Sequence, residues 1–245
     1  MRVVRLKPWV IIIFSLVFIS SIIYYSSKII IWYKHINENQ EVIKELKKNI
    51  KVEKEKVEID FDALKSINPD TVGYIKVNNT NIDYIVVKGK DNNYYLSHNF
   101  EKKWNVAGWI FGDYRNKFDE TDKNLIIYGH NTKDGSMFDS LIKVLNKDWY
   151  NNPDNHIINL VTEMGIYKYQ VFSTYSIVPE EYYITTDFAS NEYFGKFVKK
   201  IKSRSIYKYD VEVTGEDKIL TLSSCIGEGQ KRVVLHAKLI EKEER

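Results

Sequence analysis

The longest apolar stretch of the chain lies near its amino terminus. Residues 9–27 carry no charge and are mostly aliphatic or aromatic, and after Lys28 the apolar character resumes through Tyr33. A helix needs roughly 20 such residues to cross the ~30 Å hydrocarbon core of a bilayer. The apolar region of a cleaved signal peptide is shorter, about 7–15 residues, and leads into small residues. We therefore predict an uncleaved transmembrane anchor within residues 1–33.

Basic residues flank this predicted span on both sides. Arg2, Arg5 and Lys7 precede it, which favours a cytoplasmic amino terminus by the positive-inside rule, but lysines also follow it. Charge counting thus favours an extracellular carboxyl-terminal domain without deciding the orientation. The expected arrangement is a single-pass membrane protein with a short cytoplasmic tip and an extracellular domain.

The next stretch, residues 34–58, is highly charged and contains neither Gly nor Pro. Its apolar residues Ile36, Ile43, Leu46 and Ile50 recur near helical spacing. A partner-binding coiled coil would need a sustained heptad, which is not present. We predict a solvated helical stalk over residues 34–58.

From residue 59 to residue 245 the pattern changes to short strand-like runs separated by turn residues, and this part is predicted to be one folded domain. The runs are rich in Val, Ile, Tyr and Thr, as expected of strands. They cover residues 71–77, 82–87, 107–111, 125–128, 156–161, 166–175, 218–223 and 232–240. Residues 136–145 and 190–202 instead place apolar side chains on one helical face. About eight strands with few helices between them predict a mainly β fold, a closed or nearly closed barrel.

Composition narrows the possible functions. The net charge is only +3 and the lysines are spread along the chain, so nucleic-acid binding has little support. The 18 Tyr and 11 Phe favour β-structure, on whose pleated surface aromatic side chains pack well. Cys225 is the only cysteine, which excludes an intramolecular disulfide and a Cys-based zinc cluster. A lone cysteine is more commonly a small buried hydrophobe than a nucleophile, so its neighbours must decide its role.

Three strand ends carry residue types suited to nucleophilic catalysis. His130 follows one apolar strand, Cys225 ends another, and Arg232 opens the next. A thiol with an ordinary pKa near 8.5 needs a base or a positive neighbour to become a useful nucleophile. Attack on a peptide carbonyl creates an oxyanion that a fixed cation stabilises, and the departing amine needs an acid of near-neutral pKa, such as histidine.

Each of these residues also has a structural alternative. His130 could simply stabilise a turn, and Arg232 could be a surface ion-pair partner. Four other histidines compete for the catalytic role: His35, His98, His156 and His236. The residues by themselves support a cysteine–histidine site and do not select its reaction.

Short motifs around these residues form a wider pattern. Residues 221–225 read T-L-S-S-C, and Arg232 opens the strand that follows. Residues 128–131 read Y-G-H-N and lead into D-G-S-M-F at 134–138, with D-Y-R-N upstream at 113–116 and Y-Y-L-S-H-N-F at 94–100. In this combination and order the chain resembles the sortase family, specifically class B, over about residues 59–245.

The resemblance implies an eight-stranded sortase-type β-barrel with a few peripheral helices and no cofactor or metal. It also implies a catalytic triad of His130, Cys225 and Arg232. By position, the class B substrate groove would include Asn92, Leu96, Tyr183, Ile184 and Ser223. Lys231 lies beside Arg232 and is the alternative cation, although the strand pattern that follows favours Arg232.

The implied reaction is thiol-dependent peptidase and acyltransferase chemistry at the membrane. The thiolate would cleave a sorting motif after Thr near the carboxyl terminus of a secreted protein. An amine of a lipid-linked peptidoglycan precursor would then resolve the thioacyl intermediate and join the protein to the cell wall. A pilin-polymerising sortase and a cell-wall cysteine hydrolase remain alternatives, as does a membrane-anchored binding module whose thiol is buried and inert.

Overall fold

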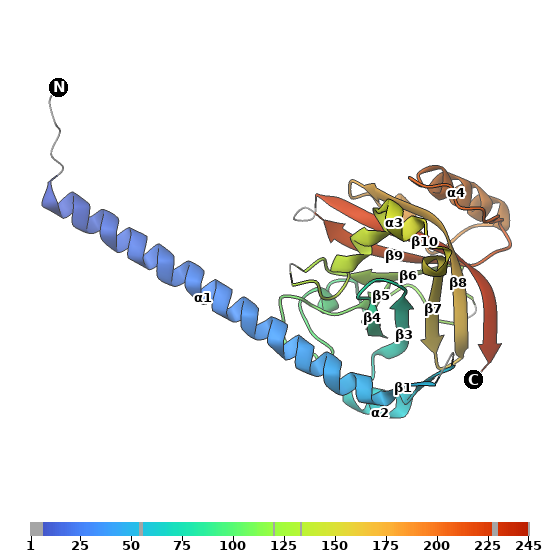
Figure 1. Ribbon diagram of the computed structural model, residues 1–245, viewed down its shortest axis with the longest axis horizontal. Helices are drawn as coiled ribbons and strands as arrows, with labels where there is room; N and C mark the ends of the chain where they lie inside the picture. The colour runs from blue at the N-terminus through green and yellow to red at the C-terminus, as the bar shows by residue number, and fades with distance from the viewer. Residues whose placement is uncertain (1–6, 54–55, 120, 133, 227–229, 245) are drawn as a thin grey trace, which may run out of the picture.

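A computed structural model describes residues 7–53, 56–119, 121–132, 134–226 and 230–244, except for the side chains at positions 52, 53, 56, 225 and 226. A single long helix leads into a β-barrel surrounded by short helices (Figure 1). The barrel is built almost entirely from the region in which short strand-like runs dominate the sequence. The predicted fold class is therefore confirmed.

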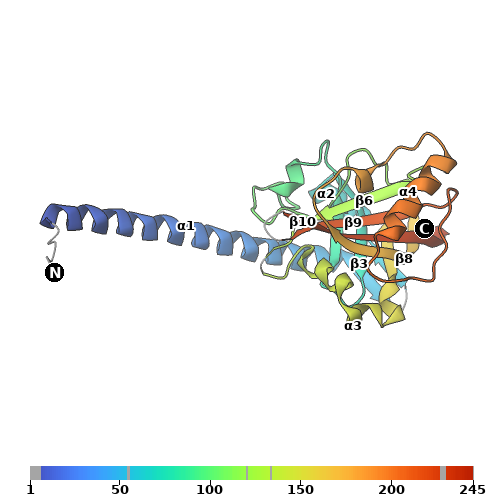
Figure 2. The same ribbon diagram turned by 90° about the horizontal axis from the view of Figure 1, so that it is seen from above.

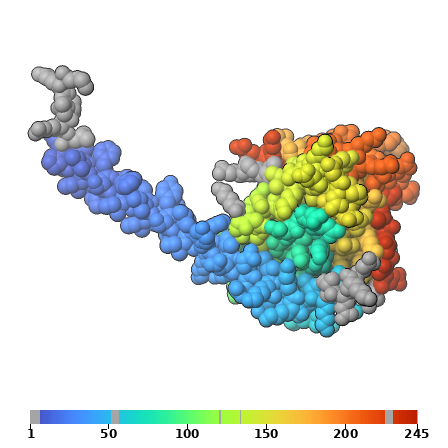
Figure 3. All heavy atoms as spheres, in the orientation of Figure 1, coloured from blue at the N-terminus to red at the C-terminus, as the bar shows by residue number. Residues whose placement is uncertain are grey.

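Helix α1 (Pro8–Leu46) contains the apolar stretch. Among the described residues, one helical segment (Pro8–Asn49) is long and apolar enough to cross a membrane, judged by length and composition. Its apolar half projects away from the barrel, whereas its other half lies directly against the domain in the space-filling view (Figure 3). His35, Ile36, Asn39 and Leu46 are buried there.

The predicted stalk over residues 34–58 is only partly helical and is not free in solvent. The helix ends at Leu46, a 3₁₀ turn η1 (Lys47–Asn49) follows, and β1 (Ile50–Glu53) pairs with β2 (Lys56–Ile59) as a separate hairpin. The reason is that Leu46 belongs to the hydrophobic core and Ile43 and Ile50 pack against it. The helical spacing of apolar residues thus marked a docked face of α1.

Eight strands of the described chain close into a barrel in the order β10-β8-β7-β3-β4-β5-β6-β9. The barrel strands are β3 (Thr71–Val77), β4 (Asp83–Val87), β5 (Phe111–Gly112), β6 (Asn124–Gly129), β7 (Ile157–Thr162), β8 (Gly165–Ile177), β9 (Ile219–Ile226) and β10 (Lys231–Glu244). The core that fills and covers the barrel is rich in aromatics, and Trp109, Tyr95 and Phe172 are almost completely buried. Each predicted strand is present, most within a few residues of the expected bounds.

The shorter elements surround the barrel. They are α2 (Phe61–Ile67), η2 (Tyr94–Leu96), η3 (Asp139–Leu145), α3 (Lys147–Tyr150), η4 (Pro153–His156), η5 (Tyr182–Ile184) and α4 (Asn191–Ser203). Helix α4 matches the prediction for residues 190–202, with Phe194, Phe197 and Ile201 buried. The predicted helix over 136–145 is the 3₁₀ segment η3, and α2 was not predicted.

The predicted strand at residues 107–111 is reduced to Phe111–Gly112. Its earlier residues bind other partners: Trp109 N–H donates to the Tyr95 carbonyl at 2.9 Å, and Asn39 Nδ2 donates to the Gly108 carbonyl at 3.3 Å. Gly108 has a φ of +58°, and a Cβ there would overlap the backbone of Tyr95 and Leu96. This glycine allows η2 to pack closely against the segment before β5.

The strand ends next to His130, Cys225 and Arg232 lie together at one end of the barrel, the rim. Strands β6 and β9 run parallel, so their carboxyl ends lie at the same rim, and β10 begins there because it runs antiparallel to β9. In both Figure 1 and Figure 2 the chain's carboxyl terminus, at the other end of β10, lies on the side far from the apolar half of α1. The rim therefore faces the side from which α1 emerges.

Candidate functional site

A pocket of about 440 Å³ opens at this rim. Every groove residue expected from the sequence lines it, together with His130 and Arg232. The other lining residues are Phe111, Tyr128, Gly129, Pro179, Glu180 and Glu181. The fold thus gathers residues from η2, β6, β9, β10 and the segment around η5 into one cavity.

His130 is held in place immediately after β6. Its Nε2 lies 2.7 Å from the Leu96 carbonyl oxygen, and its own carbonyl accepts a 2.8 Å hydrogen bond from Phe138 N–H. Since a carbonyl oxygen can only accept, Nε2 carries the proton and donates it, which leaves Nδ1 as the nitrogen able to take one up. A Cβ at the preceding Gly129 would lie 2.5 Å from Ile110 Cδ1, so glycine permits the close packing that sets this turn.

Cys225 and Arg232 are directly paired by the β9–β10 register. The side chain of Cys225 lies outside the described residues. Its backbone is the second-last residue of β9, two positions after Ser223, which lines the pocket. Arg232 is half-buried and lines the pocket, and its Nη1 donates to the Lys231 carbonyl at 3.2 Å. Opposed residues of an antiparallel pair share one face of the sheet.

Lys231 lies on the other side of β10. It pairs with Ile226, its side chain is exposed, and it is absent from the described lining of the pocket. Consecutive residues of a strand point to opposite faces. The geometry therefore places Arg232, rather than Lys231, at the pocket.

Ser223 and Tyr183 join two walls of the pocket. The Ser223 and Tyr183 hydroxyls are 3.0 Å apart, and both side chains are at most 3% exposed. This contact fastens η5, which also carries Ile184, to β9. The two residues are far apart in sequence, so their proximity depends on the closed barrel.

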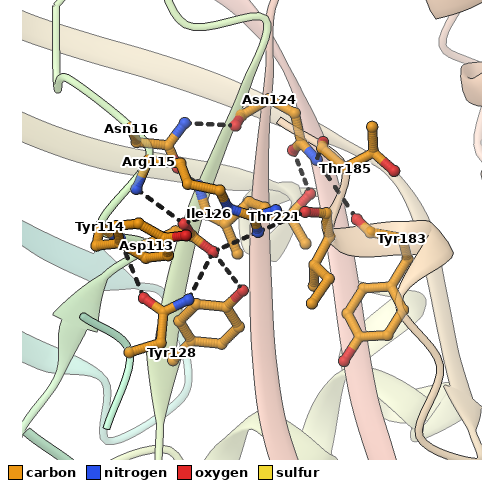
Figure 4. Close-up of polar contacts among 12 residues, drawn as sticks. Asp113, Tyr114, Arg115, Asn116, Asn124, Ile126, Tyr128, Tyr183, Thr185 and Thr221 are labelled. Atoms are coloured by element: carbon orange, nitrogen blue, oxygen red, sulfur yellow. Dashed lines mark hydrogen bonds and ion pairs between the residues drawn. The ribbon is translucent and has the colours of Figure 1, made fainter. Parts of the chain in front are cut away.

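The carboxylate of Asp113 is hydrogen-bonded to side chains from several segments, among them Tyr128 of the pocket lining (Figure 4). Asp113 is fully buried and accepts hydrogen bonds from Arg115 Nε at 2.8 Å and Nη2 at 2.7 Å, from Tyr128 Oη at 2.8 Å, and from Asn92 Nδ2 at 3.0 Å. Burial by itself raises the pKa of Asp113, but these hydrogen bonds, led by Arg115, lower it below its usual value. The group is therefore an anion at neutral pH.

Asp113 connects three separate parts of the pocket lining. Asn92 comes from the segment before η2, Tyr128 comes from β6, and Arg115 Nη2 also donates to the Ile184 carbonyl at 2.8 Å. Asn92, Tyr128 and Ile184 all line the pocket. The D-Y-R-N motif at 113–116 was the sequence signal for this cluster. Its role could not be predicted from the sequence, because its partners are distant in the chain.

The four competing histidines lie elsewhere. His35 lies inside α1, where it contacts Trp104, and His98 stacks on Tyr94 with ring centroids 4.0 Å apart. His156 bonds to the Tyr150 carbonyl, and burial lowers its pKa. His236 is fully buried within the barrel wall. None of the four is among the described residues that line the pocket.

Comparison with known proteins agrees with this arrangement. Residues 75–240 match the sortase domain family. Sortase B of Listeria monocytogenes is 40% identical over 182 residues, covering 73% of each chain, and sortase B of Staphylococcus aureus is 38% identical over 190 residues, covering 76% of this chain and 77% of the other. A sortase B structure from B. anthracis in complex with AAEK1 superposes with a TM-score of 0.76 at 37% identity, covering 87% of this chain and all of that one (100%). A Clostridium perfringens sortase B gives 0.70 at 36% identity, covering 74% of this chain and 100% of that one.

Proposed function

Since the chain belongs to the sortase family, with sortase B proteins among its relatives, we propose that it is a membrane-anchored cysteine transpeptidase. It cleaves a carboxyl-terminal sorting motif after Thr and transfers the cleaved protein to an amine of a lipid-linked peptidoglycan precursor. Helix α1 anchors it in the cell membrane with the barrel outside the cell. The main support is the register that pairs Cys225 with Arg232 at the rim of the pocket that holds His130.

In the acylation step of this proposal, the Cys225 thiol gives its proton to Nδ1 of His130, and the resulting thiolate attacks the Thr carbonyl carbon. A carbon–sulfur bond forms, and the carbonyl oxygen becomes an oxyanion beside the Arg232 guanidinium. The carbon–nitrogen bond then breaks, and the departing amine takes a proton from His130. A planar, permanently charged donor suits the oxyanion because it needs no reorganisation as the charge develops.

In the second step the acceptor amine attacks the thioester carbonyl. His130 takes up the proton that this amine loses, and the thiolate leaves as the new amide bond forms. The hydrogen bond from His130 Nε2 to the Leu96 carbonyl supports this role, because it holds the ring in place and leaves Nδ1 for proton exchange. Asn92, Leu96, Tyr183, Ile184 and Ser223 form the groove for the sorting motif in this proposal.

The first prediction tests the nucleophile. Replacing Cys225 by Ala should abolish cleavage and transfer completely, because the chain has no second thiol. The measurement follows cleavage of a small library of sorting peptides by the detergent-solubilised full chain, with and without added acceptor amines. Ser224→Ala, next to the nucleophile, serves as the matched variant, and circular dichroism checks that both are folded.

The library separates the possible outcomes. Transfer to an amine identifies a transpeptidase and its acceptor, whereas cleavage that only water completes identifies a hydrolase. Turnover by Cys225→Ala at more than a few per cent of the wild-type rate would rule out the covalent mechanism.

A further inference from the structure

The contact between α1 and the barrel begins at the very end of the predicted span. The ring of His35 packs edge-on against Trp104, with centroids 4.8 Å apart, and Asn105 Nδ2 donates to the His35 carbonyl at 2.8 Å. One turn further along, Asn39 Nδ2 donates to the Gly108 carbonyl. The apolar stretch ends at Tyr33, so no free linker separates anchor from domain among the described residues.

This contact fixes how far Trp104 lies from the bilayer. A helix rises about 1.5 Å per residue, so His35 is only about 3 Å further along the axis than Tyr33. Side chains on a helix tilt toward its amino terminus, which is the membrane end of α1 here. The Trp104 ring that packs on His35 therefore lies at about the level where the anchor leaves the lipid.

Four exposed apolar side chains form an edge beside this contact, the apolar edge. They are Trp104, Val106, Leu96 and Tyr94, which are 56%, 39%, 38% and 36% exposed. The two segments that carry them are held side by side, since Asn105 N–H donates to the Ser97 carbonyl and Trp109 N–H to the Tyr95 carbonyl, both at 2.9 Å. Large aromatic side chains of this kind are enriched at the level of lipid headgroups.

Three lysines near the apolar edge are paired with carboxylates. Lys102 contacts Asp70 at 2.9 Å, Lys103 contacts Glu101 at 2.8 Å, and Lys34 is 3.8 Å from Glu38. Such pairs leave little net charge to attract an anionic surface, whose effect on a protein comes from unpaired basic residues. The edge therefore suits a zwitterionic headgroup layer.

We propose that the apolar edge lies in the headgroup layer of the membrane that holds α1, so that the catalytic rim faces the bilayer. This inference rests on the membrane anchor of the proposed function. The edge adjoins the site directly, because Leu96 both lines the pocket and holds His130 through its carbonyl. The rim also lies on the side from which α1 emerges (Figures 1 and 2). The pocket thus opens toward substrates that are themselves attached to the membrane.

Tryptophan fluorescence tests the position of the edge in the full chain. Trp9→Phe and Trp32→Phe remove the two anchor tryptophans and leave Trp104, together with Trp109 and Trp149, which are only 1% and 4% exposed. The protein is reconstituted in phosphatidylcholine vesicles with and without a lipid that carries a nitroxide on its headgroup. We expect the nitroxide to quench part of the emission, and the further change Trp104→Phe to remove the quenched part.

Two matched variants complete the experiment. Ile240→Trp, made in the Trp104→Phe background, places a tryptophan at a 46% exposed position of β10, toward the strand end that lies away from the rim, and it should not be quenched. A variant that keeps Trp32 and lacks Trp104 reports whether the anchor is inserted. Because the edge is charge-paired, adding anionic lipid or salt should leave Trp104 quenching unchanged.

The outcomes separate the edge from the function. If the nitroxide quenches Trp32 but not Trp104, the anchor is inserted and the proposed position of the apolar edge is wrong. If it quenches neither tryptophan, both the membrane anchor and the position of the edge are wrong. Trp104 shielded from acrylamide but not quenched by the lipid nitroxide points to a second copy of the chain and also overturns the proposal. Quenched Trp104 in a protein that transfers no peptide supports the docked edge while the proposed function fails.

Discussion

Strands β6, β9 and β10 carry two groups of polar side chains that differ in what surrounds them. At the rim, His130, Ser223 and Arg232 line an open pocket. Further along the same strands, Asn124, Thr221 and His236 are completely buried, and Tyr175 of β8 is 2% exposed. The residue types are similar, but only the rim group is open to a substrate.

The buried group satisfies its own hydrogen bonds. Thr221 Oγ1 donates to Asn124 Oδ1 at 2.6 Å and accepts from His236 Nδ1 at 2.8 Å, while Tyr175 Oη donates to His236 Nε2 at 2.8 Å. Burial lowers the pKa of His236 to about 3, so it remains neutral and cannot shuttle protons near pH 7. The comparison teaches that position relative to the rim decides whether a histidine here is sealed in the core or open to a substrate.

Among the residues of the rim and of the buried group, substitution of Arg232 is expected to lower activity the most. In the proposed mechanism it meets a charge that exists only as the tetrahedral species forms, so its loss should lower kcat more than it raises KM. Arg232→Ala should reduce kcat by about 10²–10³-fold, the range for a deleted oxyanion donor. Arg232→Lys keeps the charge but loses the planar fork, and it should remain severely impaired. Steady-state cleavage of one sorting peptide measures both variants, and a near-normal Arg232→Ala enzyme would contradict the assignment.

A smaller effect on activity is expected at Asp113, behind the rim. Asn in its place presents an amide N–H₂ to groups that all donate to it now, namely Arg115, Tyr128 and Asn92. An unsatisfied buried donor costs about 1–3 kcal/mol, so Asp113→Asn should lose stability by that amount and kcat/KM by about 10-fold.

Asp122→Asn is the matched control for this prediction. Asp122 accepts hydrogen bonds from Asn116 Nδ2 and from the backbone of Lys117 and Phe118, and it is not among the residues that line the pocket. It should lower stability while leaving kcat/KM close to the wild-type value. Urea unfolding and peptide cleavage measure the two quantities, and equal activities of the two variants would refute a special role for Asp113.

The buried histidine should control stability without affecting catalysis. The folded-state pKa of His236 is about 3, below the ordinary 6.5, so the unfolded chain binds more protons between these values. Stability should therefore be unaffected by this group above pH 6.5 and should fall toward pH 3, by up to about 1.4 kcal/mol per pH unit. His236→Phe should flatten that dependence, cost about 1–3 kcal/mol at neutral pH because Tyr175 loses its acceptor, and retain activity.

Unfolding free energies between pH 4 and pH 7.5 provide the measurement for His236. His98→Phe is the control, because it makes the same substitution at a half-buried histidine that stacks on Tyr94 and leaves His236 in place. An unaltered slope in His236→Phe would mean that another group accounts for the acid sensitivity.

The smallest effect is expected at Lys231. It lies next to Arg232 but faces away from the pocket and is exposed, so Lys231→Ala should leave kcat and KM nearly unchanged. The same peptide assay used for Arg232 measures it. A crippled Lys231→Ala enzyme beside a normal Arg232→Ala enzyme would transfer the cationic role to Lys231.

The sequence predicted the strands and the rim for a physical reason. Strands β6, β9 and β10 are rich in β-branched and other apolar residues, so their ends could be located. The candidate residues His130, Cys225 and Arg232 stand at those ends. Whether these residues act as proposed remains a prediction. The docked face of α1 was misread as a solvated stalk because an apolar helical stripe has the same spacing whether or not a surface covers it.

The hydrogen bonds that hold the pocket lining and α1 in place could not be predicted from the sequence. Arg115 and Ile184 are 69 positions apart, and Asn105 and His35 are 70 positions apart. Contacts of this kind follow from barrel closure and from the docking of α1, rather than from any local pattern. The Asp113 cluster and the attachment of α1 therefore required the three-dimensional arrangement.

The parallel pairing of β6 with β9 also has a consequence for the order in which the protein folds and its site forms. Thr221 and Asn124, bonded across this pair, are 97 positions apart, and contacts of such high sequence separation form slowly during folding. The loop between them closes at an entropic cost that grows only as the logarithm of its length, so the delay lies in the conformational search rather than in final stability. Until that pairing forms, His130 and Cys225 belong to unconnected parts of the chain. In the proposed mechanism, a half-folded chain therefore carries its thiol apart from its proton donor, and catalysis requires that β6 and β9 have already paired.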